Sequence, residues 1–267
     1  MFLDEILNVK KNEIASKKAN ASLRLLERSL YRCAPVRSFG ESLRGETIRL
    51  IAEVKKASPS KGLLCPNFNP AVLAKSYEAG GAAAISVLTD EKFFQGSLEF
   101  LKQVKEATLK TPVLRKDFIL DPYQLVEARI GGADAVLLII AALSKEDFHF
   151  LLKVALSLEL TPLVEVHNYA ELEIALEAEA RVIGINNRDL KTFEVTLATT
   201  YQLLAEIPIS QRNEITIVSE SGIQNRHDIE ELAGAGVNAV LIGESIVTAK
   251  DPQRQIQDLL GVSHDSC

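Results

Sequence analysis

The sequence predicts an α/β fold, a (β/α)8 (TIM) barrel with an extra N-terminal helical segment, and three observations favour it. Short apolar runs alternate with helical patterns along most of the 267 residues. The pattern Gly-[Ala/Val]-x-Ala-[Val/Ile] begins at Gly81, Gly132 and Gly236. Its spacings of 51 and 104 residues are close to multiples of about 26, a plausible length for one strand-and-helix unit. Polar residues gather where the apolar runs end, which is where barrel enzymes carry their active sites.

The eight apolar runs are nearly continuous rather than alternating, as expected for parallel strands that are buried on both faces. They lie at 49–54, 83–88, 112–115, 134–140, 161–166, 182–186, 215–219 and 238–242. Helical patterns lie between them, for example at 98–107, 122–130, 145–158, 169–178 and 227–233. A doubly wound open sheet would also alternate strands with helices. No Gly-x-Gly-x-x-Gly follows the first run, so the barrel is favoured.

The first 47 residues lie outside this alternation of strands and helices. Segments 2–18 and 20–32 repeat apolar residues on one face, which predicts two amphipathic helices that cover one end of the barrel. These helices could also help to close the barrel mouth over a substrate. No Gly/Ser-rich or Pro-rich linker separates them from the rest. We therefore predict one domain over 1–267, with an N-terminal extension at 1–47 and the barrel at 48–260.

Composition and charge narrow the function classes. The net charge is −6, which disfavours a broad nucleic-acid-binding face because phosphate backbones require clustered Lys and Arg. A small anionic substrate remains compatible, since a few local cations can outweigh the global sign. No apolar run approaches the length of a membrane span, and the N-terminus does not resemble a signal peptide. The cysteines Cys33, Cys65 and Cys267 are far apart and odd in number, which favours a reducing cytoplasm over a disulfide framework.

Five of the predicted strands end in ionisable or amide side chains. These are Glu53 and Lys55, Lys116, Glu165, Asn186 and Arg188, and Glu220. The ends of strands meet solvent, so a single charged residue there needs no functional explanation. An unpaired buried charge is strongly unfavourable, however, so charges that interrupt apolar runs are either paired or serve a site. Opposite charges that converge on one mouth satisfy both conditions, and we favour a catalytic cluster over structural ion pairs.

The last two predicted strand-and-helix units carry residues that are typical of a phosphate-binding site. Ser221 and Gly222 follow the seventh strand, and Gly243 follows the eighth. Glycine lets backbone N–H groups approach an anion, and a helix start adds partial positive charge. The loops after these two strands are the usual phosphate site of such barrels. The segment 58–62 after the first strand adds further donors, or is only a turn and a helix start; both interpretations stay open.

No pattern in the sequence indicates a metal site or an activated nucleophile. The histidines His149, His167, His227 and His264 lack paired ligand spacing, and there is no Gly-x-Ser-x-Gly elbow. We therefore expect no metal. Only His167 lies near the predicted rim, and we interpret it as a bystander.

Six segments resemble the indole-3-glycerol phosphate synthase family. They read IAEVKKASPSKG (51–62), LTDEKFFQGS (88–97), LRKDF (114–118), VEVH (164–167), GINNRDL (184–190) and VSESGI (218–223). The resemblance extends from about residue 3 to about residue 255. It implies a carbon–carbon lyase of tryptophan biosynthesis that needs no metal or organic cofactor. Its substrate would be 1-(2-carboxyphenylamino)-1-deoxyribulose 5-phosphate, and its products indole-3-glycerol phosphate, carbon dioxide and water.

The resemblance also implies roles by motif position. Lys116 resembles the general acid of ring closure, Glu165 the carboxylate that moves protons during dehydration, and Lys55 a lysine that contacts the substrate and can act as an acid. The groups that resemble holders of the intermediate are Glu53, Asn186 and Glu220. The positions that match substrate or phosphate binding are Ser58, Arg188, Ser221, Gly222, Leu241, Gly243 and Glu244. Which lysine donates first stays open.

Two other functions compete with this one. A sugar-phosphate isomerase resembling phosphoribosylanthranilate isomerase would have a Cys at the end of the first strand, where this chain has Glu53 and Lys55. A non-catalytic phosphate-binding barrel would lack Lys55, Lys116 or Glu165, and all three are present. We therefore expect a cytoplasmic enzyme, monomeric or weakly oligomeric, that binds a small phosphorylated substrate and neither nucleic acid nor membrane.

Overall fold

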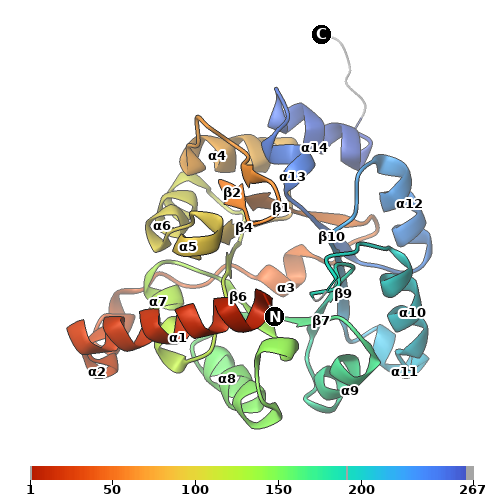
Figure 1. Cartoon of the computed structure of the whole chain (residues 1–267). Coiled ribbons are helices and arrows are strands. Elements are labelled where there is room, and N and C mark those ends of the chain that lie inside the picture. The colour runs from red at the N-terminus through yellow and green to blue at the C-terminus, as the bar shows by residue number, and fades with distance from the viewer. Residues whose placement is uncertain (1, 191, 263–267) are drawn as a thin grey trace.

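Eight parallel strands close into a barrel in the order β1-β10-β9-β8-β7-β6-β5-β4 (Figure 1). They are β1 (Arg49–Val54), β4 (Ala84–Leu88), β5 (Val113–Lys116), β6 (Ala135–Ile139), β7 (Thr161–Val166), β8 (Val182–Asn186), β9 (Thr216–Glu220) and β10 (Ala239–Ile242). This computed structural model describes residues 2–190 and 192–262. Every strand lies within one residue of the run that predicts it, so the barrel prediction is confirmed.

Helices follow the strands and surround the barrel. The longer ones are α4 (Pro70–Gly80), α6 (Leu98–Ala107), α7 (Pro122–Ile130), α8 (Lys145–Ser157), α9 (Tyr169–Glu177), α10 (Ala198–Glu206), α12 (Arg226–Gly234) and α14 (Pro252–Leu260). The short ones are α5 (Glu91–Phe94), η2 (Ile140–Ala142), α11 (Ile209–Arg212) and α13 (Glu244–Val247). Most long helices begin at an Asn, Asp or Ser whose side chain accepts a backbone N–H of the first turn, as Asn69 and Asp121 do. The five helical patterns named from the sequence are confirmed.

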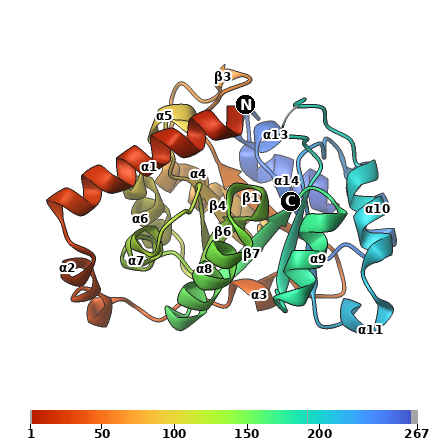
Figure 2. The same cartoon turned by 60° about the horizontal axis from the view of Figure 1, so that its bottom comes forward.

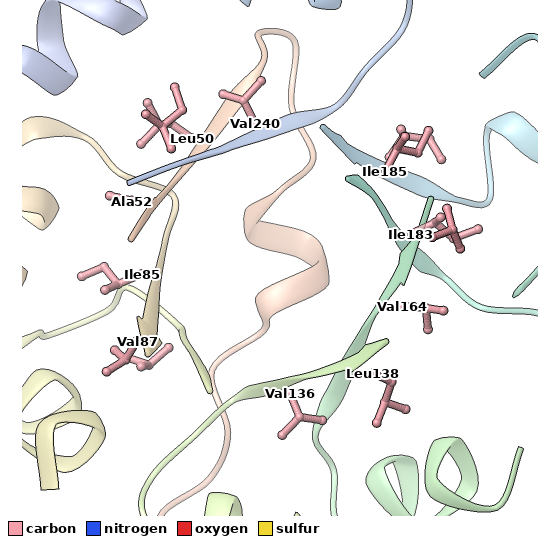
Figure 3. Packing of buried hydrophobic residues seen from close by; sticks show 14 of the residues in the cluster. Leu50, Ala52, Ile85, Val87, Val136, Leu138, Val164, Ile183, Ile185 and Val240 are labelled. Carbon is pink, nitrogen blue, oxygen red and sulfur yellow. The ribbon is translucent and has the colours of Figure 1, made fainter. Parts of the chain in front are cut away.

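The strands alternate between two faces, and this alternation sets both the core and the site. Leu50 and Ala52 point outward into the layer between strands and helices, and Figure 3 shows the same orientation for the other labelled side chains. Ile51, between them, points inward and packs in a second cluster inside the barrel. Because successive side chains point to opposite faces, Glu53 shares the inward orientation of Ile51.

The N-terminal extension covers both ends of the barrel. Helix α1 (Phe2–Asn20) lies across the mouth (Figures 1 and 2), which confirms the first predicted helix. At the opposite end, Phe39 of α3 (Phe39–Ser42) and Leu43 pack against inward-facing strand residues. The single helix predicted over 20–32 is wrong, because the segment divides into α2 (Leu23–Glu27) and η1 (Leu30–Arg32). Neither piece has a side-chain cap or a buried residue, so nothing stabilises one continuous helix.

The segment after β1 forms a small hairpin of β2 (Ala57–Ser58) and β3 (Gly62–Leu63). It is therefore a turn between two short strands, and no helix begins there. Cys33 and Cys65 are free thiols, while Cys267 and His264 lie outside the described residues. Among the described helices, none combines the length and the apolar character that crossing a membrane requires.

Candidate active site

A cavity of about 660 Å³ lies at the carboxyl ends of the strands, with Leu3 and Ile6 of α1 on its wall. Twelve of the thirteen predicted site residues line it: Glu53, Lys55, Ser58, Lys116, Glu165, Asn186, Arg188, Ser221, Gly222, Leu241, Gly243 and Glu244. The thirteenth, Glu220, is fully buried and contacts the ammonium group of Lys116. The structure thus brings together residues that are spread over nearly 200 positions of the sequence.

Strand alternation explains why these particular residues meet. Glu53, Lys116, Glu165, Asn186 and Glu220 each lie two or four positions after an inward-facing apolar or small residue of the same strand. Residues two apart in a strand share a face, so all five side chains point toward the barrel axis near its mouth.

The charged groups form a connected set of ion pairs. Lys55 Nζ lies 2.6 Å from Glu53 Oε1, and Lys116 Nζ lies 3.3 Å from Glu53 Oε2. Lys116 Nζ also donates to Glu220 Oε2 at 3.0 Å. Lys116 is therefore held between two carboxylates while it still borders the cavity.

These contacts set the protonation of Glu53 and Lys116. Burial acts to raise the pKa of Glu53, but the ammonium groups of Lys55 and Lys116 hold that pKa at about 2. Burial acts to lower the pKa of Lys116, and the negative charges of Glu220, Glu53 and Glu165 more than reverse this and raise the pKa. Glu53 is thus an anion and Lys116 a proton-carrying cation near neutral pH.

Glu220 differs from the other carboxylates. Burial raises its pKa to about 7, with the charges of Glu165 and Glu53 acting in the same direction and Lys116 opposing them. Its Oε1 atom has no hydrogen-bond partner among the described residues. Glu220 therefore gains and loses a proton near neutral pH, where its neighbours do not.

Glu165 is paired with a histidine that the sequence analysis set aside. His167 Nε2 lies 3.2 Å from Glu165 Oε1, and His167 Nδ1 lies 3.0 Å from Glu171 Oε2. Burial acts to raise the pKa of Glu165, but His167, Lys116 and Asn186 lower it. Burial likewise acts to lower the pKa of His167, but the two carboxylates raise it to about 10. In the sequence, the only sign of this arrangement was the spacing of His167 and Glu171, which lie four residues apart at the start of a helix.

Two glycines make room for buried carboxylates. A Cβ on Gly184 in β8 would collide with Glu220 Oε1, and a Cβ on Gly243 would collide with Glu53 Oε1. Neither glycine has a positive φ angle, so the requirement here is space and not backbone conformation. Gly243 was predicted as a phosphate-site residue, and the structure adds this second reason for a glycine there.

One corner of the cavity has the form of an anion site. Ser221 and Gly222 have φ angles of 66° and 84°, and such consecutive left-handed residues can turn neighbouring N–H groups toward one anion. Gly243 follows the neighbouring strand β10 and immediately precedes α13. The exposed carboxylate of Glu244 lies 3.6 Å from Lys61 Nζ of the β2–β3 hairpin, so the hairpin contributes a cation at this corner.

Aromatic and apolar residues line the rest of the cavity. Phe94 and Phe118 have ring centroids 6.4 Å apart, and both border the cavity with Leu137 and Ile139. The sequence analysis assigned these residues no role, although Phe94 and Phe118 lie inside two of the segments that carry the family resemblance. They give the cavity an apolar surface beside its charged groups.

A buried network ties α1 to the site. Lys10 is 1% exposed, and its Nζ lies 2.8 Å from Asp90 Oδ2 and 3.0 Å from Asp117 Oδ1. Asp117 also pairs with Arg115 at 3.0 Å. The sequence analysis missed Lys10, because nothing local distinguishes it from the exposed lysine that follows it.

Within residues 2–190 and 192–262, no group of three or more His, Cys, Asp and Glu side chains is arranged to hold a metal ion. The expectation that no metal or cofactor takes part stays a prediction.

The fold and the site define a class: a (β/α)8-barrel protein with buried lysine–carboxylate pairs at the mouth of the barrel, an arrangement typical of acid–base enzymes. The family model for indole-3-glycerol phosphate synthase matches residues 3–259. An indole-3-glycerol phosphate synthase of Desulforamulus reducens is 46% identical over 97% of both chains. One from Streptomyces coelicolor is 47% identical over 97% of this chain and 94% of its own length. The chain belongs to the indole-3-glycerol phosphate synthase family, and it is a carboxy-lyase of tryptophan biosynthesis.

Solved structures of low sequence identity share the fold. A thiamine phosphate pyrophosphorylase from Pyrococcus furiosus has a TM-score of 0.61 at 17% identity and covers 83% of this chain and 96% of its own. A chain of the tryptophan synthase α2β2 complex from the same organism has a TM-score of 0.58 at 15% identity, with coverages of 80% and 98%. These likenesses show the barrel architecture alone.

Proposed function

We propose that the residues at the cavity floor divide the ring-closing reaction into an acid step at Lys116 and a proton-transfer step at Glu165. The observation that carries this proposal is the position of Lys116 Nζ, 3.0 Å from Glu220 and 3.3 Å from Glu53 at the edge of the cavity. A lysine between two carboxylates keeps its proton until a substrate oxygen accepts it. It is therefore suited to act as a general acid at neutral pH.

The chemistry needs such an acid. Ring closure joins an aromatic carbon, a poor nucleophile, to the ketose carbonyl carbon of the substrate. A proton from Lys116 to the carbonyl oxygen makes that carbon more electrophilic. Carbon dioxide then leaves, and its bonding electron pair returns to the ring system. In the last step the new hydroxyl group accepts a proton from Lys55, the second acid, and departs as water. Glu165 takes a proton from the adjacent CH2 carbon of the new ring, and the electron pair of that C–H bond forms the C=C bond of the indole.

The remaining residues bind and orient the substrate in this proposal. Glu53, Asn186 and Glu220 hold the intermediate, and Lys55, which pairs with Glu53 at 2.6 Å, contacts the substrate and is a second possible acid. The phosphate occupies the corner formed by Ser58, Ser221, Gly222, Leu241, Gly243 and Glu244. Arg188 binds the substrate at the mouth. The apolar wall around Phe94 and Phe118 accommodates the aromatic ring, since buried aromatic contacts favour ring stacking.

Fluorescence of the indole product tests the acid assignment. The chain contains no Trp, so its own background is low. With substrate and a chelator present, we expect the unaltered protein to produce indole fluorescence. Because Lys116 supplies the proton, Lys116→Ala should reduce kcat by about 10²–10⁴-fold. Lys75→Ala, an exposed lysine of α4 away from the cavity, is the matched control and should keep full activity.

Two outcomes would contradict the proposal. A Lys116→Ala protein with the rate of the unaltered chain would refute the acid assignment. Absence of indole product from folded, unaltered protein would refute ring closure and favour the isomerase or binding-barrel alternatives.

We also propose that the enzyme acts in the cytoplasm as one domain, monomeric or weakly oligomeric, without a metal or organic cofactor. Free Cys33 and Cys65 are compatible with a reducing compartment. Sedimentation over a range of protein concentrations tests the oligomeric state.

A further inference from the structure

The ring of His167 lies between two carboxylates, one in the site and one outside it. On the inner side its Nε2 is 3.2 Å from Glu165 Oε1, and on the outer side its Nδ1 is 3.0 Å from Glu171 Oε2. The side chain of His167 is 10% exposed and that of Glu171 16%. His167 does not line the cavity, so it reaches the substrate only through Glu165.

Glu171 fixes this arrangement. Its Oε2 accepts hydrogen bonds from both the backbone N–H of His167, at 2.8 Å, and the ring Nδ1. Its Oε1 accepts from the side chain of Asn168 at 2.6 Å. Asn168 in turn caps the start of α9 by accepting from the backbone N–H of Glu171. The imidazole is therefore held on its Nδ1 side by the start of α9. Its Nε2 lies 3.2 Å from Glu165 Oε1, within ion-pair distance but without hydrogen-bond geometry.

Among residues 2–190 and 192–262, the ion pairs of the His167 ring are those with Glu165 and Glu171. Glu165 comes from β7 itself and Glu171 from α9. The adjoining segments η2 and the end of β6 contribute Ile139–Ala142, which are uncharged. Lys145, at the start of α8, pairs with Glu177 at 2.6 Å instead. The charges that act most strongly on His167 are thus the two glutamates, and both favour the imidazolium form.

The site holds more buried carboxylates than lysines. Glu53, Glu165 and Glu220 are buried carboxylates, whereas only Lys55 and Lys116 are lysines of the cluster. Both lysines pair with Glu53, and Lys116 also pairs with Glu220. Glu165 has its close cationic partner in His167. Without that partner, a buried carboxylate near other negative charges would take up a proton.

We propose that His167 is a positioning residue that keeps Glu165 ionised and oriented for proton transfer, with Glu171 holding the imidazolium in place. This inference rests on the role of Glu165 in the proposed function. It replaces the interpretation of His167 as a bystander. His167 makes no contact with the reacting atoms, so its effect is on the charge and direction of the Glu165 carboxylate.

The pH profile of the single-turnover rate tests the inference. An opposite charge within about 4–6 Å lowers a carboxyl pKa by about 1–3 units. His167→Gln removes that charge from Glu165. The acidic limb of the rate profile, where Glu165 becomes protonated, should therefore move to higher pH by about 1–2 units. At pH values below this limb, the rate of the His167→Gln protein should fall about 10-fold per pH unit. At high pH it should return to the rate of the unaltered protein. KM should change less than about 2-fold, because His167 does not border the cavity. Glu171→Gln should instead move the basic limb to lower pH, because the imidazolium loses one of its two carboxylates.

The matched control is His227→Gln. His227 lies near the start of α12 and also faces a glutamate four residues later, Glu231, at 3.6 Å. That pair is exposed and lies outside the cavity, so neither limb should move. A purely structural role for His167 would lower the rate by one factor at every pH and leave both limbs in place, and that result would overturn the inference.

Two further measurements separate this inference from the proposed function. If His167 acts through Glu165, His167→Gln added to Glu165→Gln should change the rate by less than about 2-fold. A Glu165→Gln protein with a normal rate would refute the role of Glu165 itself. A slow Glu165→Gln protein beside a His167→Gln protein with a normal profile would refute only the role of His167.

Nitrogen NMR of the imidazole should find both ring nitrogens of His167 protonated at pH 8. A neutral ring at that pH would also overturn the inference.

Discussion

Glu220 occupies space that only a glycine at position 184 leaves open. A Cβ there would collide with Glu220 Oε1 and lie 3.3 Å from Leu163 Cδ1. We expect Gly184→Ala to displace the Glu220 carboxylate and weaken its contact with Lys116, which lowers kcat by about 10-fold or more. Overpacking should also cost about 1–3 kcal/mol of stability. Steady-state kinetics and urea unfolding measure both effects.

Gly234→Ala is the control for Gly184→Ala. Gly234 lies at the end of α12, and a Cβ there would meet no atom within 4 Å. Kinetics should not change, and stability should stay equal or rise by up to about 1 kcal/mol. Normal kinetics for Gly184→Ala would contradict the view that the position of Glu220 matters for the reaction.

The sequence identified the charged residues of the site but not their pairing. Glu53, Glu165 and Glu220 stand out because each interrupts or directly follows an apolar run, and strand alternation then directs them inward. Their partners depend on which strands are neighbours across the barrel and on side-chain direction. Lys116, for instance, meets Glu220 from 104 residues away. His167 illustrates the limit, because its spacing from Glu171 was visible while the direction of its ring toward Glu165 was not.

At the scale of elements, Glu78 of α4 holds the segment that leads from α6 into β5. Its Oε1 accepts from the backbone N–H groups of Lys110 and Thr111, at 3.1 and 3.0 Å, and from the Thr111 hydroxyl at 2.7 Å. Its Oε2 accepts from the backbone N–H of Leu109 at 3.1 Å. Burial acts to raise the pKa of Glu78, but these hydrogen bonds lower it from 4.5 to about 2.

This contact predicts a pH-dependent stability difference. Because the pKa of Glu78 is lower in the folded state, its ionised form stabilises the fold above about pH 4.5 and loses that effect as the pH falls toward 2. Glu78 is partly exposed, so solvent screening limits the effect to about 1 kcal/mol. Glu78→Gln should therefore lower the unfolding free energy by that amount at pH 7, and by progressively less below pH 4.5. Urea unfolding at several pH values measures this.

Glu106, an exposed carboxylate of α6, provides the control. Glu106→Gln should alter stability by less than about 0.5 kcal/mol at pH 7. A Glu78→Gln difference that stays constant from pH 7 to pH 3 would contradict the assignment of its effect to the ionised carboxylate.

Elements with a strong local pattern were predictable, and elements fixed by packing were not. The strands are continuous apolar runs, and helices such as α7 begin at a capping residue followed by proline. The region 20–32 has apolar periodicity but no cap and no buried face, so it divides into short pieces. The β2–β3 hairpin has only two residues in each strand, too few for a periodic signal.

At the scale of the whole molecule, the N-terminal extension forms part of the site as well as of the fold. Leu3 and Ile6 border the cavity, and α1 crosses the barrel mouth (Figure 2). Lys10 anchors this helix to Asp90 after β4 and to Asp117 after β5. The segments that follow these two strands also carry Phe94, the last residue of α5, and Phe118, both of the cavity wall. The anchor therefore connects the docking of α1 with the shape of the cavity.

Removal of the Lys10 charge should release α1 and leave the buried Asp90 without its cation, while Asp117 keeps its pair with Arg115. Breaking a buried ion pair from one side costs about 3–5 kcal/mol, so we expect Lys10→Met to lower the unfolding free energy by about 3 kcal/mol. KM should rise on the order of 10-fold, since Leu3 and Ile6 no longer hold the cavity wall in place. Lys11→Met, at an exposed position of the same helix, should change neither quantity. Hydrogen exchange of α1 amides should increase in Lys10→Met alone, and deletion of residues 1–30 should give the upper limit of the KM increase. A normal KM in both the Lys10→Met protein and the deletion would mean that α1 stabilises the barrel without helping to bind the substrate.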